Sequence, residues 1–188
     1  VLETVFGDYI TFIVLLFGLF CVAGNICLEG DLVGKPKLNV LLLLIGTLLS
    51  SWIGTTGASM VMIRPLIRAN KWRHRKVQIV VFFIFLVSNI GGCLTPVGDP
   101  PLLMGFTRGV DFFWSMHLVP VMLLNVVLLL TLFFILDTRA YKKDLADGAA
   151  PEQSEDKKPL KLSGAHNIIF LVMIVGAVVL SGVLPKTV

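Results

Sequence analysis

The sequence predicts an all-α polytopic membrane protein, built from spanning helices together with a re-entrant helical hairpin and a broken helix. Hydrophobic residues make up 56% of the chain, above the roughly 45–50% that is usual in soluble domains. They form long continuous runs, whereas the strands of a membrane β-barrel alternate apolar and polar residues. The third observation is a stretch rich in proline, glycine and polar residues, at 88–101, between two apolar segments. We therefore expect several membrane crossings, one of them interrupted.

The first predicted spanning helix covers residues 9–28, which carry no charge. Such a length is enough to cross a hydrocarbon core about 30 Å thick. The next apolar run, 39–52, would reach only about 21 Å as a helix and is too short to cross. Small and hydroxylated residues follow at 54–59, and a second arm ends at residue 69. We interpret 39–69 as a re-entrant hairpin with its tip at 54–59. A single long helix with a glycine kink is the alternative.

Residues 77–107 are predicted to form the broken helix, interrupted by the stretch that begins at Ser88 and includes Asp99. Proline removes a backbone donor, and glycine loses the most entropy when it is held in a helix. Unwound backbone survives at membrane depth only where protein buries it or where it lines a wet cavity. Discontinuous helices of this kind are typical of transport sites.

A long spanning helix is predicted at 112–136, a polar linker at 137–164, and a further crossing from 165. With a re-entrant hairpin, all but two of the 16 lysines and arginines fall on one side of the membrane, the exceptions being Arg108 and Lys186. The positive-inside rule assigns that side to the cytoplasm. The protein is expected to be a multi-pass protein of the inner (cytoplasmic) membrane, with its basic loops and linker 137–164 in the cytoplasm.

Asp99 is the main candidate for a functional group, because it is the only acidic residue inside the predicted membrane-spanning part. A carboxylate at membrane depth is costly, and such residues usually belong to ion or proton pathways. A structural role is the alternative: Asp99 is well placed to cap a short helix that begins at Pro100. The two roles are compatible.

The other candidate ligands are neutral oxygen groups, which hard cations such as Na⁺ prefer. They are Ser88, Asn89 and Thr95, the hydroxyls of Thr55, Thr56 and Ser59 at the hairpin tip, and the backbone carbonyls around Gly91, Gly92 and Gly98. Free N–H groups at a helix start would suit an anion instead. Asp99 and Asn89 are the candidate sodium ligands. For each hydroxyl, a local bond to the helix backbone is the alternative.

No enzyme motif is present in the sequence, and the chain is expected to be neither an enzyme nor a nucleic-acid-binding protein. There is no Gly-x-Ser-x-Gly, no His-Glu-x-x-His and no phosphate-binding loop. The expected partners are the lipid bilayer and a small ion substrate. No cofactor is expected beyond transported Na⁺ and H⁺.

Two motifs carry a family resemblance. They are Thr55-Thr56-Gly57-Ala58-Ser59-Met60, continued by Ile63-Arg64-Pro65-Leu66-Ile67-Arg68-Ala69-Asn70, and Ser88-Asn89-Ile90-Gly91-Gly92, continued by Thr95-Pro96-Val97-Gly98-Asp99-Pro100-Pro101. The chain resembles the ion transporter superfamily over roughly residues 9–136. That superfamily includes citrate-transporter-like proteins, divalent-anion/sodium symporters, arsenite efflux permeases and NhaD-type sodium/proton antiporters.

The resemblance implies a homodimeric, inverted-repeat elevator-type transporter, of which this chain would be a fragment. Residues 1–136 would be the first repeat, 137–164 the linker, and 165–188 the truncated first helix of the second half. The site would combine the hairpin tip with the unwound loop at 88–100.

Two departures from the dicarboxylate symporters favour the antiporter branch. Those symporters resemble one another in a Ser-Asn-Thr hairpin tip, where this chain has Gly54-Thr55-Thr56-Gly57. They also tend to have an uncharged residue at the position of Asp99. The function predicted first is sodium/proton antiport by alternating access, with Na⁺ and H⁺ competing for Asp99. The alternatives are an anion transporter, for citrate, dicarboxylate or arsenite, and a membrane scaffold without transport of its own.

Overall fold

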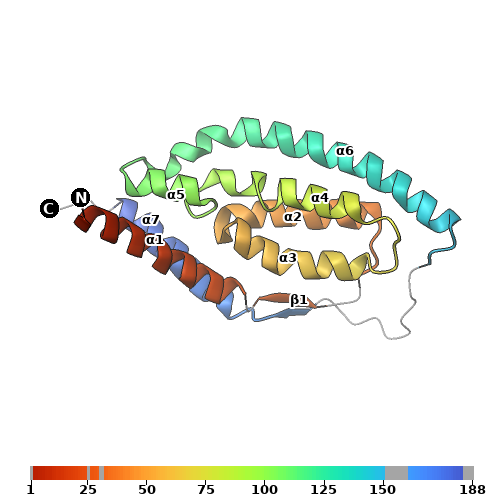
Figure 1. Cartoon of the computed structure of the whole chain (residues 1–188), viewed down its shortest axis with the longest axis horizontal. Coiled ribbons are helices and arrows are strands. Elements are labelled where there is room, and N and C mark those ends of the chain that lie inside the picture. Colours follow the sequence, from red (N-terminus) through yellow and green to blue (C-terminus); the bar gives the residue numbers. More distant parts are fainter. Residues whose placement is uncertain (1, 25, 30–31, 151–160, 184–188) are drawn as a thin grey trace.

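The computed structural model describes the chain except for residues 1, 25, 30–31, 151–160 and 184–188. The described part is almost entirely helical (Figure 1). The α-helices are α1 (Leu2–Ala23), α2 (Pro36–Ile53), α3 (Thr55–Ala69), α4 (Val77–Leu86), α5 (Pro100–Thr107), α6 (Val119–Ala146) and α7 (Asn167–Val183). Two 3₁₀ helices, η1 (Ile90–Leu94) and η2 (Phe112–Leu118), and two strands, β1 (Cys27–Glu29) and β2 (Lys161–Ser163), complete it. The predicted helical membrane fold is confirmed.

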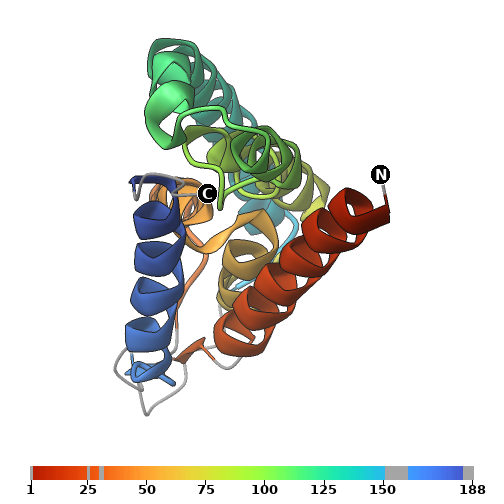
Figure 2. The ribbon, with the colours of Figure 1, turned by 90° about the vertical axis from the view of Figure 1, so that its left-hand side faces the viewer.

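Within the part of the chain that the structure describes, three helical stretches are long and apolar enough to cross a membrane: Pro36–Ile53, Val77–Leu94 and Phe112–Ala146. The run of α4 and α5 lies alongside α6 in Figure 1, and both α2 and α4 pack against α6. Viewed along the long axis, α1 and α7 diverge from one end, with part of the hairpin between them and α6 at the far side of the molecule (Figure 2). Leu43, Leu66, Leu86 and Phe133, one from each of α2, α3, α4 and α6, are at most 1% exposed and form the centre of the core.

The helices α2 and α3 form the predicted hairpin, and they meet at Gly54. Its φ of +79° is a conformation that glycine adopts without a steric penalty, so the chain can reverse there. The predicted first arm of fourteen residues is wrong, because α2 has 18 residues and is long enough to cross a membrane. It begins earlier than the apolar run because Pro36 suits the first position of a helix. Re-entry into the membrane stays a prediction.

The predicted break in the second crossing is confirmed. Helix α4 ends at Leu86, the 3₁₀ helix η1 follows, and α5 begins only at Pro100. Along the long axis of the molecule, the hairpin turn lies level with this break rather than at the far end reached by α5 (Figure 1). The break and the hairpin tip therefore lie beside one another.

The bounds of the outer helices differ from the predictions. Helix α1 ends at Ala23, because Cys27–Glu29 leave the predicted span 9–28 to pair in antiparallel register with Lys161–Ser163. Helix α6 continues through Ala146, so the first ten residues of the predicted linker are helical. Residues 151–160 of that linker lie outside the described part of the chain.

Candidate functional site

The hairpin tip and the break are joined by direct hydrogen bonds. The backbone N–H of Thr55, the first residue of α3, donates to the carbonyl of Gly98 over 3.0 Å. One turn further along α3, the hydroxyl oxygens of Ser59 and Ser88 lie 2.8 Å apart. Four of the predicted site residues are therefore brought together from two segments of the chain.

Helix α2 also holds the unwound backbone of the break. The Ser51 hydroxyl donates to the carbonyl of Gly91, and the Thr95 hydroxyl donates to the carbonyl of Ser51. The Thr95 hydroxyl in turn accepts from the N–H of Gly98 over 3.2 Å. These bonds replace helical bonds that the break has lost, as buried backbone groups require. The Thr95 oxygen is thus occupied by structural contacts.

The glycines of the break are where other chain segments approach most closely. A β-carbon on Gly92 would lie 2.6 Å from the Thr55 methyl group and 2.8 Å from the carbonyl oxygen of Gly98. A β-carbon on Gly91 would lie 2.6 Å from the carbonyl oxygen of Thr47 on α2. The predicted glycines therefore permit close packing of the break against α2 and the hairpin tip.

A small cleft of about 30 Å³ lies at this junction, room for about one or two water molecules. It is lined by Thr55, Thr56 and Gly57 of α3, by Pro96, Val97 and Gly98 of the break, and by apolar side chains of α1 such as Leu15, Leu19 and Phe20. Helix α3 begins at the cleft without a side-chain cap. The first N–H groups of a helix have no partner within it and favour an anion.

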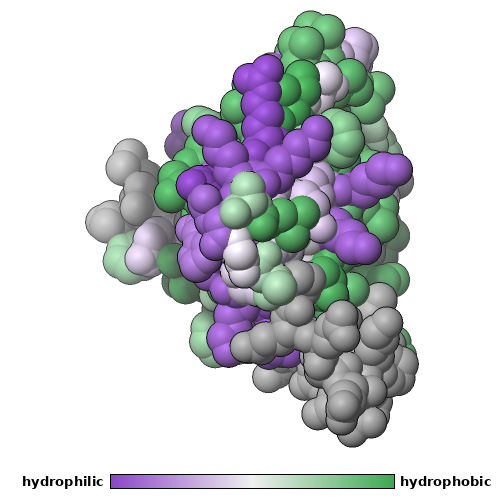
Figure 3. Space-filling view, turned by 90° about the vertical axis from the view of Figure 1, so that its right-hand side faces the viewer, coloured by the Kyte–Doolittle hydropathy of each residue, from purple (hydrophilic) through white to green (hydrophobic). Residues whose placement is uncertain are grey.

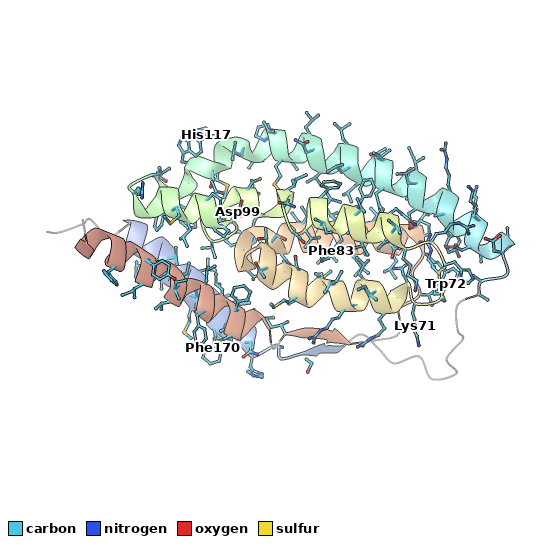
Figure 4. All side chains as sticks on the ribbon, in the orientation of Figure 1. Lys71, Trp72, Phe83, Asp99, His117 and Phe170 are labelled. Carbon is cyan, nitrogen blue, oxygen red and sulfur yellow. The ribbon has the colours of Figure 1, made fainter. Side chains whose placement is uncertain are left out.

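Asp99 lies at the N-cap position of α5, level with the hairpin turn (Figure 4). Its backbone carbonyl accepts from the N–H groups of Leu102 and Leu103 over 3.1 and 3.2 Å. The side chain, however, makes no capping hydrogen bond, so the predicted structural role belongs to the backbone alone. The half-buried carboxylate has no hydrogen bond or ion pair within the described part of the chain. It does not line the cleft, although its neighbours Gly98 and Pro100 do.

Asn89 lies apart from this group. Its side chain is exposed, and its amide donates to the carbonyl of Ile84 over 3.2 Å, the local backbone bond that was the alternative to ion binding. Thr56 is also exposed, and it faces the cleft. Among the described residues, no contact brings the Asn89 and Asp99 side chains together, so nothing supports their pairing as sodium ligands.

A buried ion-pair cluster that the sequence did not indicate joins the outer end of the hairpin to α6. Arg73, in the loop after α3, bonds Asp137 over 2.5 Å and Asp144 over 3.0 Å, and all three side chains are fully buried. Arg75 bonds Asp144 and, over 2.7 Å, Asp147. The hydrogen bonds to Asp147 and Asp144 raise the pKa of Arg75 above its ordinary value, so this guanidinium stays charged.

Two asparagines extend the cluster into the hairpin. Asn39 of α2 and Asn70 at the end of α3 exchange hydrogen bonds of 3.0 and 2.8 Å. Asn39 also donates to Asp137 over 3.0 Å. Both ends of the hairpin and helix α6 are therefore tied together far from the tip.

A larger groove, of about 510 Å³, lies between the hairpin and α7. Apolar side chains such as Leu49, Val61, Leu171 and Val175 line it, with the ring of Trp52. It offers almost no polar surface to an ion, so the junction of tip and break is the stronger candidate site despite its smaller volume.

The Ser59–Ser88 contact predicts a measurable coupling between tip and break. We expect Ser59→Ala and Ser88→Ala each to destabilise the protein by about 1 kcal/mol, the usual contribution of one hydrogen bond. The double variant should lose less stability than the sum of the losses in the two single variants, because both single variants lose the same hydrogen bond. Unfolding midpoints of the purified variants in detergent would measure this. Full additivity would show that the two hydroxyls do not interact.

Comparison with known proteins gives one match. A family model described as "Putative citrate transport" matches residues 1–188 of the chain. No curated protein and no solved structure matches.

Proposed function

The chain belongs to this citrate-transport family, and on that premise we propose that it forms part of a secondary active transporter of citrate-type anions coupled to a cation. Membership of a transport family agrees with the expectation that the chain is not an enzyme. The observation that carries the proposal is the junction of the hairpin tip with the break. A helix start, which favours an anion, and an unpartnered carboxylate, which favours a cation, lie near one another there, because the N–H of Thr55 bonds the carbonyl of Gly98, the residue before Asp99.

The size of the cleft limits what this chain binds alone. A volume of about 30 Å³ admits a water-sized ion or one carboxylate group, and a whole citrate is larger. We propose that one carboxylate of the anion approaches the start of α3, near Thr56 and Gly57, and that the rest of the anion is held by a second half of the transporter. The coupling cation would neutralise Asp99, which would otherwise repel the anion.

Sodium/proton antiport is the second candidate, and the half-buried, unpartnered carboxylate of Asp99 favours it. In that case Na⁺ and H⁺ compete for the carboxylate, and no anion is carried. The two candidates differ in whether citrate moves, while both require Asp99.

We further propose, from the positive-inside rule and the resemblance, that the protein is a homodimer in an inner membrane. The end that carries the Arg73 cluster would then face the cytoplasm.

Replacing Asp99 by asparagine tests both candidates. We expect cation-dependent citrate uptake into cells or vesicles carrying the full-length transporter to fall by about 10- to 100-fold, the effect of losing a contact to a charged group worth about 1.5–3 kcal/mol. Asp111→Asn is the matched control, since that exposed carboxylate only caps η2 and should leave uptake unchanged.

The outcomes separate the candidates. If citrate uptake persisted in Asp99→Asn with the same cation dependence, Asp99 would not be the group that couples citrate transport to the cation. The unaltered protein could instead show no citrate uptake, but Na⁺-linked proton movement in inside-out vesicles that Asp99→Asn abolishes. That result would favour sodium/proton antiport over anion transport.

A further inference from the structure

One end of the molecule carries a concentrated hydrophilic surface. It lies where the loop 70–76 meets the start of α2 and the end of α6, and hydrophilic side chains gather over it in Figure 3. Lys71 and Trp72 are found at this end in Figure 4. The opposite end, where α5 lies, carries Arg108.

The three acidic side chains described at this end are all paired with Arg73 or Arg75, which leaves one surplus negative charge. Asp137 and Asp144 are fully buried against Arg73, and Asp147 bonds Arg75. The remaining carboxylates whose side chains the structure describes, Asp99 and Asp111, lie at the break and beyond it. Among the described residues, only this one surplus charge is left at this end to set against the other basic residues.

Those other basic residues are exposed, and none forms an ion pair within the described part of the chain. They are Lys35 and Lys37 at the start of α2, Arg68 and Lys71 at the end of α3, and Arg139, Lys142 and Lys143 on α6. We call these seven residues the basic end. The bonds from Asn39 to Asp137 and from Arg73 to Asp144 hold their three segments together, so the charges form one surface.

The basic end borders a surface that suits lipid tails. On α6, exposed apolar side chains continue to Leu132, Ile135 and Leu136, and the first exposed cation, Arg139, follows within one turn. A change from apolar to basic over this distance is what a helix shows where it leaves the hydrocarbon and enters the headgroup region. Any anion that binds there meets the basic residues at the edge of the bilayer.

We propose that the basic end binds the headgroups of anionic phospholipids. The Arg73 cluster makes this possible, because Asp137 and Asp144 are buried against Arg73 and the exposed Asp147 is paired with Arg75. Basic residues next to a membrane segment attract anionic lipid by their summed charge, with a strength that salt reduces. A soluble polyanion would be attracted by the same charges, but the adjoining apolar surface favours a ligand that has acyl chains. The inference needs only that the protein is embedded in a membrane, and it is independent of what is transported.

Lipid-dependent thermal stability of the purified protein tests the proposal. The protein would be held in dodecyl maltoside micelles mixed with dioleoyl phosphatidylglycerol or with dioleoyl phosphatidylcholine. We expect the anionic lipid to raise the unfolding midpoint more than the zwitterionic lipid does, and high salt to remove the difference. In the variant Lys37→Gln/Lys142→Gln/Lys143→Gln, the difference should fall by roughly half, because about half of the charge is lost.

Two further variants separate lipid binding from other effects. Lys37→Arg/Lys142→Arg/Lys143→Arg keeps the charge and should keep the full difference between the lipids. Arg108→Gln removes a charge at the other end and should also keep it. Equal midpoints in the two lipids, or an undiminished difference in the glutamine variant, would overturn the proposal. So would an equal rise caused by sodium polyphosphate without anionic lipid, because the ligand would then be a soluble polyanion.

Discussion

Replacing Arg73 by methionine is expected to lower the free energy of unfolding by about 3–5 kcal/mol, the usual cost of removing one partner from a buried ion pair. The guanidinium is fully buried between Asp137 and Asp144, which are themselves fully buried. Methionine fills much of the same space but leaves two buried carboxylates without their main partner. Denaturation of the purified protein in mixed micelles, with increasing dodecyl sulfate, would measure the loss.

Arg139→Met is the matched control for Arg73→Met. Arg139 also lies at the basic end but is exposed and forms no ion pair within the described part of the chain, so its replacement should change stability by less than about 0.5 kcal/mol. Adding Asp137→Asn and Asp144→Asn to Arg73→Met should recover part of the loss, because no buried charge then remains. Equal midpoints for the two methionine variants would contradict the buried cluster.

The sequence could not reveal this cluster, because its members are far apart in the chain. Arg73 is 64 residues from Asp137 and 71 residues from Asp144. In sequence, Arg73 belongs to a run of basic residues typical of a cytoplasmic loop, and Asp137 looks like the start of a polar linker. Residues 137–146 instead continue helix α6, because two of their carboxylates have partners in the fold. The pairing of β1 with β2 is likewise a contact between short segments that carry no local signal.

The features that depend on local chemistry were predictable. Proline and glycine cannot be held cheaply within a helix, so the break between α4 and α5 followed from composition. The reversal at Gly54 followed from a cluster of small residues between apolar arms. The partner of each polar group could not be predicted in this way: the Thr95 hydroxyl bonds a carbonyl of α2, and the Asn89 amide bonds a carbonyl of the preceding helix α4. Residue type identifies candidate ligands, while only the packing decides which of them are already occupied.

Gly98→Ala is expected to disrupt the candidate site more than any other single-methyl change. The β-carbon would lie 2.8 Å from the carbonyl carbon of Gly92 and closer still to its oxygen. Both atoms belong to the backbone, so no side chain can rotate away, and overpacking of this kind costs about 1–3 kcal/mol or more. The φ of Gly98 is not positive, so steric contact alone opposes alanine. We expect a lower unfolding midpoint in detergent and a greater proportional loss of citrate uptake.

The greater loss of uptake follows from what Gly98 holds in place. Its carbonyl accepts the hydrogen bond from Thr55 at the hairpin tip, so moving the backbone at Gly98 also moves the start of α3 and the cleft beside it. Gly176→Ala is the matched control: no heavy atom lies within 4 Å of the added carbon, and alanine favours a helix such as α7. It should keep uptake and match or exceed the stability of the unaltered protein. If Gly98→Ala also kept uptake and stability, the break and the tip could not be in contact. The junction would then no longer be a candidate for the transport site.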